Sequence, residues 1–266
     1  MKVGIFCNTS AKRFADICTR LEQILQERKI AYRIFYAVDE IVDSDVLFVL
    51  GGDGTILKVA IAAGKRGIDL VGINAGNLGF LTEFEGEQVR EAVELISGNY
   101  TTEERTVLEV QFGEKKFYAL NDAVLQRAYS AEADNNVISV TAEIDGNKVD
   151  EFVGDGVIVS TPTGSTAYSL SAGGSVLAPG IGAFILTPVC THSLHNRPIV
   201  YSDASTMRVR LNEDTHADLF CDGAFACAVV PGEEVVVRRA PFGVRFIVRP
   251  DSNFFAKLLY KLNKWS

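Results

Sequence analysis

The feature that most constrains this chain is a glycine turn set between two apolar stretches. Val46–Leu50 has the composition of a buried strand, and Ile56–Ala63 continues as an apolar helix. Between them lies Gly51-Gly52-Asp53-Gly54-Thr55. Glycine has no Cβ, so it tolerates a sharp turn and leaves room for a ligand close to the backbone. Because N–H groups at the start of a helix attract anions, the turn predicts a phosphate site.

Asp53 is the unusual member of this turn. A carboxylate repels phosphate, so Asp53 is expected to hold a metal ion or to accept a proton rather than to contact the anion. The alternative is structural, with Asp53 acting only as the N-cap of the following helix.

The first 98 residues have the pattern of a Rossmann-like parallel α/β domain, because strands alternate with amphipathic helices. The expected strands are Val3–Cys7, Ala31–Tyr36, Val46–Leu50 and Leu70–Ile73. In such sheets ligands bind beyond the carboxyl ends of the strands. The turn at Asp53 and a second glycine-rich turn, Asn74–Leu81, both follow strands and are therefore expected at that edge.

Residues 99–250 change to short alternating stretches separated by turn residues, which predicts a β-rich, sandwich-like second domain. Val107–Phe112, Phe152–Val159 and Arg245–Val248 are examples of the expected strands. Residues 251–266 form an amphipathic C-terminal helix, which we expect to pack back on the first domain.

The charge balance argues against a nucleic-acid groove. The chain of 266 residues has 26 Lys and Arg against 34 Asp and Glu, a net charge of −8, and no basic run stands out. Five cysteines without Cys-x-x-Cys spacing indicate reduced thiols in a cytoplasmic protein. A strand-like run directly after Met1 leaves no room for a signal peptide, and no apolar stretch reaches membrane-spanning length.

Two polar segments of the β-rich half are candidates for ligand contacts. Asn121-Asp122 interrupts an apolar strand, and a carboxylate can accept two ribose hydroxyls; the alternative is a turn or bulge. Gly154-Asp155-Gly156 precedes Thr161–Gly174, whose hydroxyls and helix-start N–H groups suit a nucleotide. Tyr168 could offer an aromatic face to a base. Here the alternative is a polar surface loop.

Several common nucleotide and hydrolase motifs are missing from the sequence. There is no Gly-x-x-x-x-Gly-Lys-Ser/Thr loop, and the Gly-x-Gly pairs at Gly52 and Gly154 lack the third glycine of a dinucleotide fingerprint. No Gly-x-Ser-x-Gly elbow is present.

Taken together, these segments resemble the bacterial NAD kinases. The run from Thr161 to Gly174 after Gly154-Asp155-Gly156 is similar to that family's NAD-binding signature almost letter for letter, and the turn at Asp53 is its Gly-Gly-Asp-Gly-Thr motif. The resemblance extends to Gly72–Leu81, Arg197–Val200 and Asp222-Gly223. It implies transfer of the γ-phosphoryl of ATP to the 2′-hydroxyl of the adenosine ribose of NAD, with a divalent cation, Mg²⁺, and a homodimer or homotetramer.

The resemblance also implies roles for individual residues. Asp53 would be the catalytic proton acceptor, and the ATP phosphates would meet Gly51, Gly52, Gly54 and Thr55. Residues 99–250 would form the NAD-binding domain. The NAD contacts would be Asp53, Gly54, Lys58, Asn121, Asp122, Asp155, Thr166, Ala167, Tyr168, Ser169, Leu170 and Ser171. No metal ligand is identified.

Three positions depart from the family pattern. Asp122 stands where a glutamate is usual, so its carboxylate is one methylene shorter. Val153 replaces an arginine that is associated with the choice between NAD and NADH, and Ala224 replaces a polar residue after Asp222-Gly223. Two alternatives stay open on the sequence: a soluble lipid kinase that shares the glycine turn, and a nucleotide sensor that transfers no phosphate.

Overall fold

The computed structural model describes residues 1–7, 12–76, 79–128, 137–192, 197–212 and 216–265. The chain divides into two compact units. Unit 1 comprises Met1–Arg105 together with Gly243–Ser266, and unit 2 comprises Thr106–Phe242. None of the helices within the described ranges is long and apolar enough to cross a membrane.

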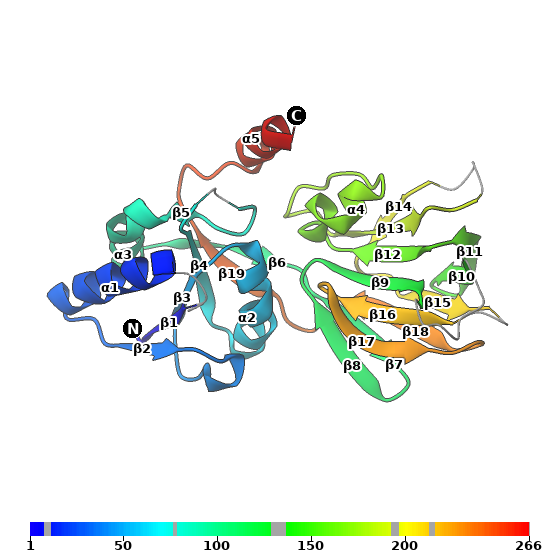
Figure 1. The fold of residues 1–266 in the computed structure, drawn as a ribbon, viewed down its shortest axis with the longest axis horizontal. Coiled ribbons are helices and arrows are strands. Elements are labelled where there is room, and N and C mark those ends of the chain that lie inside the picture. Colours follow the sequence, from blue (N-terminus) through cyan, green and yellow to red (C-terminus); the bar gives the residue numbers. More distant parts are fainter. Residues whose placement is uncertain (8–11, 77–78, 129–136, 193–196, 213–215, 266) are drawn as a thin grey trace. The chain divides into compact units, whose positions relative to one another are not determined.

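Unit 1 is built on a seven-stranded sheet of order β2-β1-β3-β4-β19-β6, with β5 paired to β4 (Figure 1). Every pair is parallel except β19 with β6, so the expected parallel α/β sheet is confirmed and carries one antiparallel edge. Its strands are β1 (Val3–Cys7), β2 (Tyr32–Phe35), β3 (Val46–Leu50), β4 (Asp69–Asn74), β5 (Phe84–Glu85), β6 (Thr101–Arg105) and β19 (Val244–Val248).

The α-helices among the described residues of unit 1 are α1 (Lys12–Glu27), α2 (Asp53–Arg66), α3 (Val89–Ser97) and α5 (Phe254–Trp265). Apolar residues of α1 and α3 share a buried cluster with Phe48 and Leu50 of β3. Side chains alternate along a strand, so α2 covers the opposite face, where a Cβ on Gly72 would lie 2.7 Å from Ile56 Cδ1. The sheet is therefore buried on both faces, which its continuous apolar strands require.

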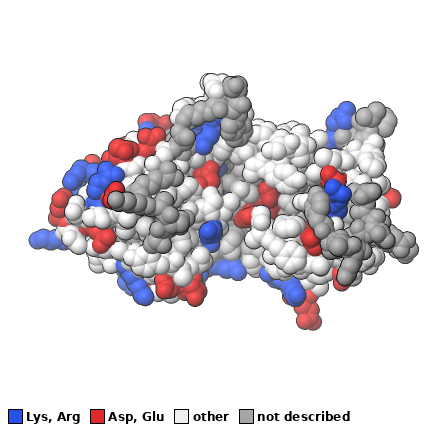
Figure 2. All heavy atoms as spheres, in the orientation of Figure 1, with Lys and Arg blue, Asp and Glu red and all other residues white. Residues whose placement is uncertain are grey.

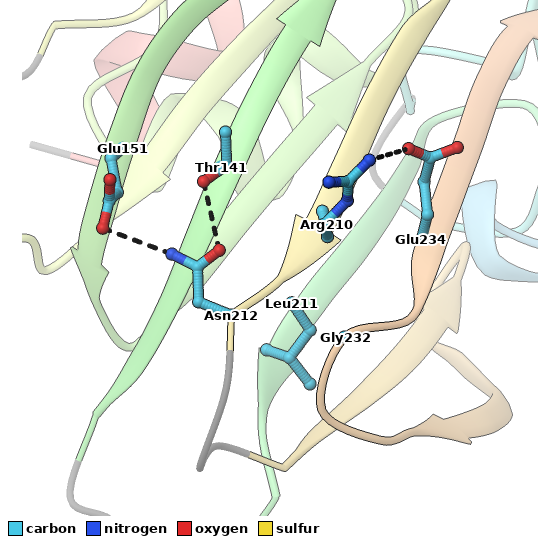
Figure 3. A pocket seen from close by; sticks show the side chains of 7 residues that line it. All are labelled: Thr141, Glu151, Arg210, Leu211, Asn212, Gly232 and Glu234. Carbon is cyan, nitrogen blue, oxygen red and sulfur yellow. Dashed lines mark hydrogen bonds and ion pairs between the residues drawn. The ribbon is translucent and has the colours of Figure 1, made fainter.

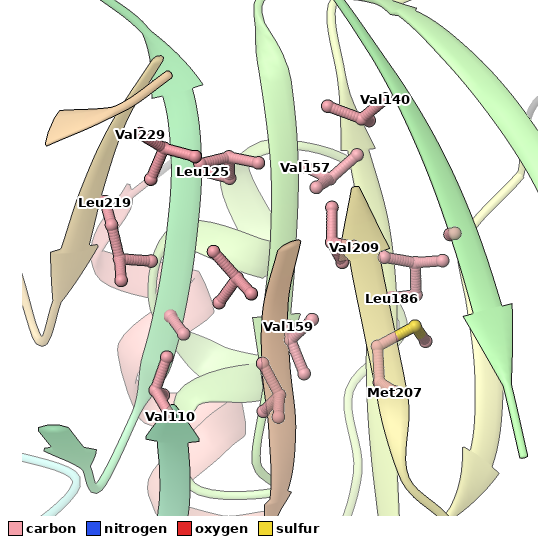
Figure 4. Close-up of a cluster of buried hydrophobic side chains, with 14 of the residues drawn as sticks. Val110, Leu125, Val140, Val157, Val159, Leu186, Met207, Val209, Leu219 and Val229 are labelled. Atoms are coloured by element: carbon pink, nitrogen blue, oxygen red, sulfur yellow. The ribbon is translucent and has the colours of Figure 1, made fainter. Parts of the chain in front are cut away.

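Unit 2 contains two six-stranded sheets, one of order β11-β10-β15-β18-β7-β8 and one of order β14-β13-β12-β9-β16-β17. Valine and leucine side chains of both sheets form one buried cluster, as in a sandwich (Figure 4). The elements are β7 (Leu108–Phe112), β8 (Lys115–Ala119), β9 (Asp122–Arg127), β10 (Ile138–Ile144), β11 (Asn147–Gly154), β12 (Gly156–Ser160), α4 (Tyr168–Ser171), β13 (Ala183–Val189), β14 (Ile199–Ser202), β15 (Met207–Leu211), β16 (Ala217–Cys221), β17 (Ala224–Val229) and β18 (Glu234–Arg239).

Two sequence-based expectations about strands differ from the structure. Phe152–Val159 is not one strand, because the chain leaves one sheet at Gly154 and enters the other at Gly156. Arg245–Val248 was assigned to the second domain, but β19 extends the sheet of unit 1 beside β4 and β6. The units accordingly meet along the sequence at 105/106 and 242/243, whereas the sequence suggested boundaries at 98 and 250.

Candidate functional site

Asp53 is the first residue of α2, and Gly51 and Gly52 connect it to the carboxyl end of β3. Both of its carboxylate oxygens accept backbone N–H groups: Oδ2 from Phe80 at 2.8 Å and Oδ1 from Leu81 at 3.1 Å. Phe80 and Leu81 belong to the second glycine-rich turn, which follows β4. Because β3 and β4 are parallel neighbours, the two turns lie at one edge of the sheet, as the sequence predicted.

Two glycines are required for this arrangement. A Cβ on Gly79 would lie 1.9 Å from Asp53 Oδ1, so only glycine lets the second turn approach the carboxylate so closely. A Cβ on Gly51 would lie 2.3 Å from Thr55 Oγ1. The Gly79 N–H also donates to the buried Thr82 hydroxyl at 2.5 Å, which fixes the turn that holds Asp53.

Gly52 and Gly54 differ from these two glycines because nothing lies within 4 Å of a Cβ built on either residue. Gly52 is the N-cap of α2, so the first N–H groups of the helix follow it. Open space beside a helix start is what a bound phosphate needs. Lys58 is exposed on the same helix, five residues and roughly 7.5 Å of helix axis beyond Asp53.

In unit 2, Asn121 and Asp122 are held by Asp222. The Asp222 carboxylate accepts the N–H groups of Leu120 at 2.8 Å, Asn121 at 2.7 Å and Asp122 at 3.2 Å. Asp222 and Gly223 form the two-residue turn between β16 and β17, and both have positive φ, as such hairpins demand. The turn recognised in the sequence therefore supports the start of β9.

Asp122 itself is 5% exposed and sits close to the Asp222 charge. Burial, reinforced by Asp222, raises the pKa of Asp122 to about 7. Burial also raises the pKa of Asp222, although the three backbone N–H groups act in the opposite direction. Asp122 can thus change its protonation state near neutral pH.

The hydroxyl-rich run packs against this pair. The Thr161 N–H donates to Asn121 O at 2.9 Å, and the Thr161 hydroxyl donates to Leu120 O at 2.6 Å. A Cβ on Gly164 would lie 2.0 Å from Asn121 O. The structure therefore brings together two segments that the sequence singled out separately.

Most hydroxyls of the run are bonded inside unit 2. The Ser165 hydroxyl donates to Pro162 O at 2.6 Å, Thr166 Oγ1 donates to Thr163 O at 3.2 Å, and Ser169 Oγ lies 2.8 Å from Thr187 Oγ1. These hydroxyls build the loop and are buried. The surface of the segment is formed instead by Ala167, Leu170, Ser171 and Tyr168, the last 40% exposed.

Asp155 lies at the other end of the same strands. β12 pairs with β9 so that Ser160 faces Asp122 and Gly156 faces Gln126. The Asp155 carboxylate pairs with Arg127 Nε at 3.1 Å, beyond the Gly156 end. The intervening β12 residues Val157, Ile158 and Val159 are buried, so about 17 Å of strand separates Asp155 from the Asp122 end.

Within the described part of the chain, no three His, Cys, Asp or Glu side chains gather in a way that could hold a metal ion. Mg²⁺ usually reaches a protein on substrate phosphates, with only one or two carboxylates as protein ligands.

A cavity of 740 Å³ lies elsewhere, on the sheet that contains β10 and β15 (Figure 3). Asn212, one of its lining residues, bonds Thr141 and Glu151, while Arg210 pairs with Glu234. None of its seven lining residues is a predicted site residue, so we assign it no role in the reaction.

On the face drawn in Figure 2, the coloured acidic and basic side chains are interspersed.

Sequence reasoning missed several residues that shape the site. Phe80 and Leu81 were recognised as part of a motif but not as the groups that hold Asp53. Asp222 was likewise noted without its role as the acceptor for Asn121 and Asp122. The contact of Phe80 and Leu81 with Asp53 could have been found from the topology, since turns that follow adjacent parallel strands meet at one edge of a sheet.

Comparisons with known proteins match both halves of the chain. The family model of the ATP-NAD kinase N-terminal domain matches residues 36–100, and that of the ATP-NAD kinase C-terminal domain matches residues 120–248. The NAD kinase of Caldicellulosiruptor bescii is 34% identical over 266 residues, covering 99% of this chain and 100% of that protein. The NAD kinase of Aquifex aeolicus is 35% identical, covering 99% of each chain.

Solved structures give the same picture of the fold. The structure of an NAD kinase from Archaeoglobus fulgidus in complex with ATP has a TM-score of 0.82 and 26% identity, covering 99% of both chains. Yeast NADH kinase complexed with NADH has a TM-score of 0.88 at 24% identity, covering 99% of this chain and 87% of that one.

Proposed function

We propose residue roles for this chain from the premise that it belongs to the ATP-NAD kinase family and transfers the γ-phosphoryl of ATP to the 2′-hydroxyl of the adenosine ribose of NAD, giving NADP. The relatives give no support to the lipid kinase or to the sensor that the sequence left open.

Asp53 is the proton acceptor for the 2′-hydroxyl in this proposal. The observation that carries it is the pair of N–H groups from Phe80 and Leu81, which fix both carboxylate oxygens at a helix start. A general base must be held in hydrogen-bond reach of the proton that it removes. Phosphoryl transfer depends mainly on such placement and on cancellation of charge.

The ATP phosphates meet the turn at Gly52 and Gly54, supported by the free space beside both Cα atoms. Gly51 and Thr55 shape the turn beneath them through their mutual contact. Mg²⁺ would arrive on these phosphates and supply positive charge to the transferring group. The protein contributes the backbone donors and the orientation of Asp53.

In unit 2, NAD contacts come from Asn121, Asp122 and the segment Thr166–Ser171. Supporting this assignment, Thr161 ties the segment to Asn121. We expect direct contacts mainly from Tyr168, Ala167, Leu170 and Ser171, which reach the surface. Thr166 and Ser169 act through the shape of the loop, since their hydroxyls are bonded within it. Lys58 and Gly54 are the remaining NAD contacts of unit 1.

Asp155 serves a dinucleotide bound by a neighbouring copy, and the enzyme therefore works as a homo-oligomer. The support is the placement of Asp155 at the far end of β12 from Asp122. Because that strand is buried between its two ends, one dinucleotide cannot lie along it and touch both carboxylates.

We also place the reaction in the cytoplasm, supported by five free cysteines. Cell fractionation tests this placement.

The variant Asp53→Asn tests the central assignment. Because the amide cannot accept the proton, we expect kcat to fall by about a hundred- to ten-thousand-fold. NAD binding measured by calorimetry should change little. Asp39→Asn is the matched control: it makes the same charge change in the first turn of another helical segment of unit 1 and should leave kcat unchanged. Near-normal turnover in folded Asp53→Asn would remove Asp53 from this role.

A further inference from the structure

The segment that holds Asp53 is itself bonded to the C-terminal part of the chain. Glu83 lies two residues after Leu81, is 7% exposed, and donates its N–H to Gly72 O at 3.0 Å. Its carboxylate accepts the Arg249 N–H at 3.2 Å and the Ser252 hydroxyl at 3.2 Å, and it forms an ion pair with Lys257 of α5. A buried carboxylate thus connects α5 to the second glycine turn.

Lys257 is the cation that directly compensates the charge of the Glu83 carboxylate. Its ammonium contacts Glu83 Oε2, and its side chain is largely buried as well. Arg105 and Arg249 also interact with the Glu83 charge, but Arg105 pairs with Glu103 and Arg249 with Asp251. Removing one partner of a buried ion pair leaves an uncompensated charge, which the surrounding chain must move to solvate.

A second contact joins α5 to the same turn. Lys261, one helical turn after Lys257, places its ammonium 5.8 Å from the centroid of the Phe80 ring. Phe80 is the residue whose N–H donates to Asp53 Oδ2. The helix therefore contacts Phe80 within the turn and Glu83 just after it. The two N–H donors to Asp53 lie at Phe80 and Leu81.

We propose that α5 is a positioning element for catalysis: Lys257, through its ion pair with Glu83, holds the turn at Phe80 and Leu81 and so orients the Asp53 carboxylate. This inference rests on the role of Asp53 proposed above. Lys257 touches neither substrate nor reacting atom in this scheme, and its effect passes through the backbone of the turn.

The variant Lys257→Met keeps the length of the side chain and removes its charge. It also has room to fit, because Lys257 and Glu83 border a cavity of 380 Å³. We expect kcat to fall by about ten- to a hundredfold, since a shift of about 1 Å in a catalytic group has effects of this size. The KM values for ATP and NAD should change little, because the substrate contacts are untouched.

A rescue and a matched control separate positioning from general destabilisation. In Glu83→Gln/Lys257→Met, the buried charge is gone while the amide oxygen can still accept the Arg249 N–H, so kcat should recover. Arg245→Met removes the cation from another buried carboxylate of unit 1, Asp69, whose Oδ1 accepts Arg245 Nε at 2.5 Å. Asp69 lies at the opposite end of β4 from the glycine turns, so this variant should melt earlier but keep its kcat.

The deciding experiment repeats Lys257→Met in an Asp53→Asn background, with NADP formation followed under saturating ATP and NAD. If Lys257 acts through Asp53, the residual kcat of Asp53→Asn is unchanged by the second substitution. An equal fold-loss in both backgrounds, or a normal kcat in folded Lys257→Met, would overturn the inference. Near-normal turnover of Asp53→Asn alone would instead identify a failure of the proposed function.

Discussion

At the scale of single residues, the carboxylates of this enzyme differ by what surrounds them. Asp53 is held by two backbone N–H groups at a sheet edge, whereas Asp122 is buried next to Asp222. The family's usual glutamate is one methylene longer than Asp122. Burial of the Asp122 carboxyl, with the Asp222 charge nearby as the second cause, raises its pKa to about 7.

This shift predicts a pH dependence of stability. Between about pH 4 and pH 7, folded Asp122 retains a proton that the unfolded chain has released, so the free energy of unfolding falls as the pH rises through this window, by a few kcal/mol at most. Asp122→Asn stays neutral, and its melting temperature should fall less between pH 5 and pH 8 than that of the unmodified protein. Parallel melting curves for the two proteins would contradict the assignment.

Asp145→Asn is the control, because the pH dependence of stability that Asp145 contributes has the opposite sign. The Thr206 N–H donates to Asp145 Oδ1 and lowers the pKa of Asp145. The stabilisation from this bond is present above the pKa of the unfolded chain and is lost as the pH falls through the folded pKa. Asp145→Asn should therefore lower stability at neutral pH and reduce the loss on acidification.

At the scale of elements, the sequence predicted those strands and helices whose boundaries are set by contiguous residues. The β3 strand and the start of α2 follow from an apolar run, a glycine turn and a helical run that are contiguous in the sequence. The break at Asp155 was not predictable in this way. A Cβ built on Gly156 would lie 2.3 Å from Leu125 O, and one built on Gly154 would lie 2.8 Å from Thr191 Cα, so both positions require glycine. Leu125 and Thr191 are distant in the sequence from these glycines.

The hydroxyl-rich run shows the same limit for the candidate site. Composition marked Thr161–Ser171 as a candidate segment for ligand contacts, but it could not show that Ser165 and Ser169 are buried and bonded to Pro162 and Thr187. Hydrogen-bonding capacity in a sequence does not distinguish a hydroxyl that builds a loop from one that meets a ligand.

The glycines of the two turns give an element-scale prediction. Gly79→Ala places a Cβ against Asp53 Oδ1, so it should displace the carboxylate and lower kcat by about a hundredfold. Gly54→Ala meets no protein atom and lies within α2, so the fold should be retained or stabilised by roughly 0.5–1 kcal/mol. If ATP phosphates approach Gly54, its KM for ATP should nevertheless rise; an unchanged value would exclude that approach.

At the scale of the whole molecule, the chain leaves unit 1 after Arg105 and returns to it at Gly243. β19 then enters the sheet beside β4, with Phe246 opposite Leu70. A strand whose partner lies so far back in the sequence cannot be assigned by pattern, which explains why Arg245–Val248 seemed to belong to the β-rich half. The return also delivers α5 to Glu83 and Phe80.

If Asp155 of one copy completes the site of its neighbour, two inactive variants should restore each other's activity when they form mixed oligomers. Asp53→Asn and Asp155→Ala should each be nearly inactive alone. When the two are denatured together and refolded, a mixed dimer contains one site with both native residues, and random pairing should restore about a quarter of the unmodified activity. If Asp155 acted within its own chain, every mixed site would keep a defect and activity would stay near the mean of the two variants.

Asp53→Asn mixed with Lys257→Met is the control for this exchange. Both residues act on the same carboxylate within unit 1, so the two defects should not complement each other, whichever copies pair. Light scattering on the same samples reports whether mixed oligomers have formed. Recovery in the first mixture and none in the second would require a neighbouring copy at the site, because only a residue supplied from another chain can be replaced in this way.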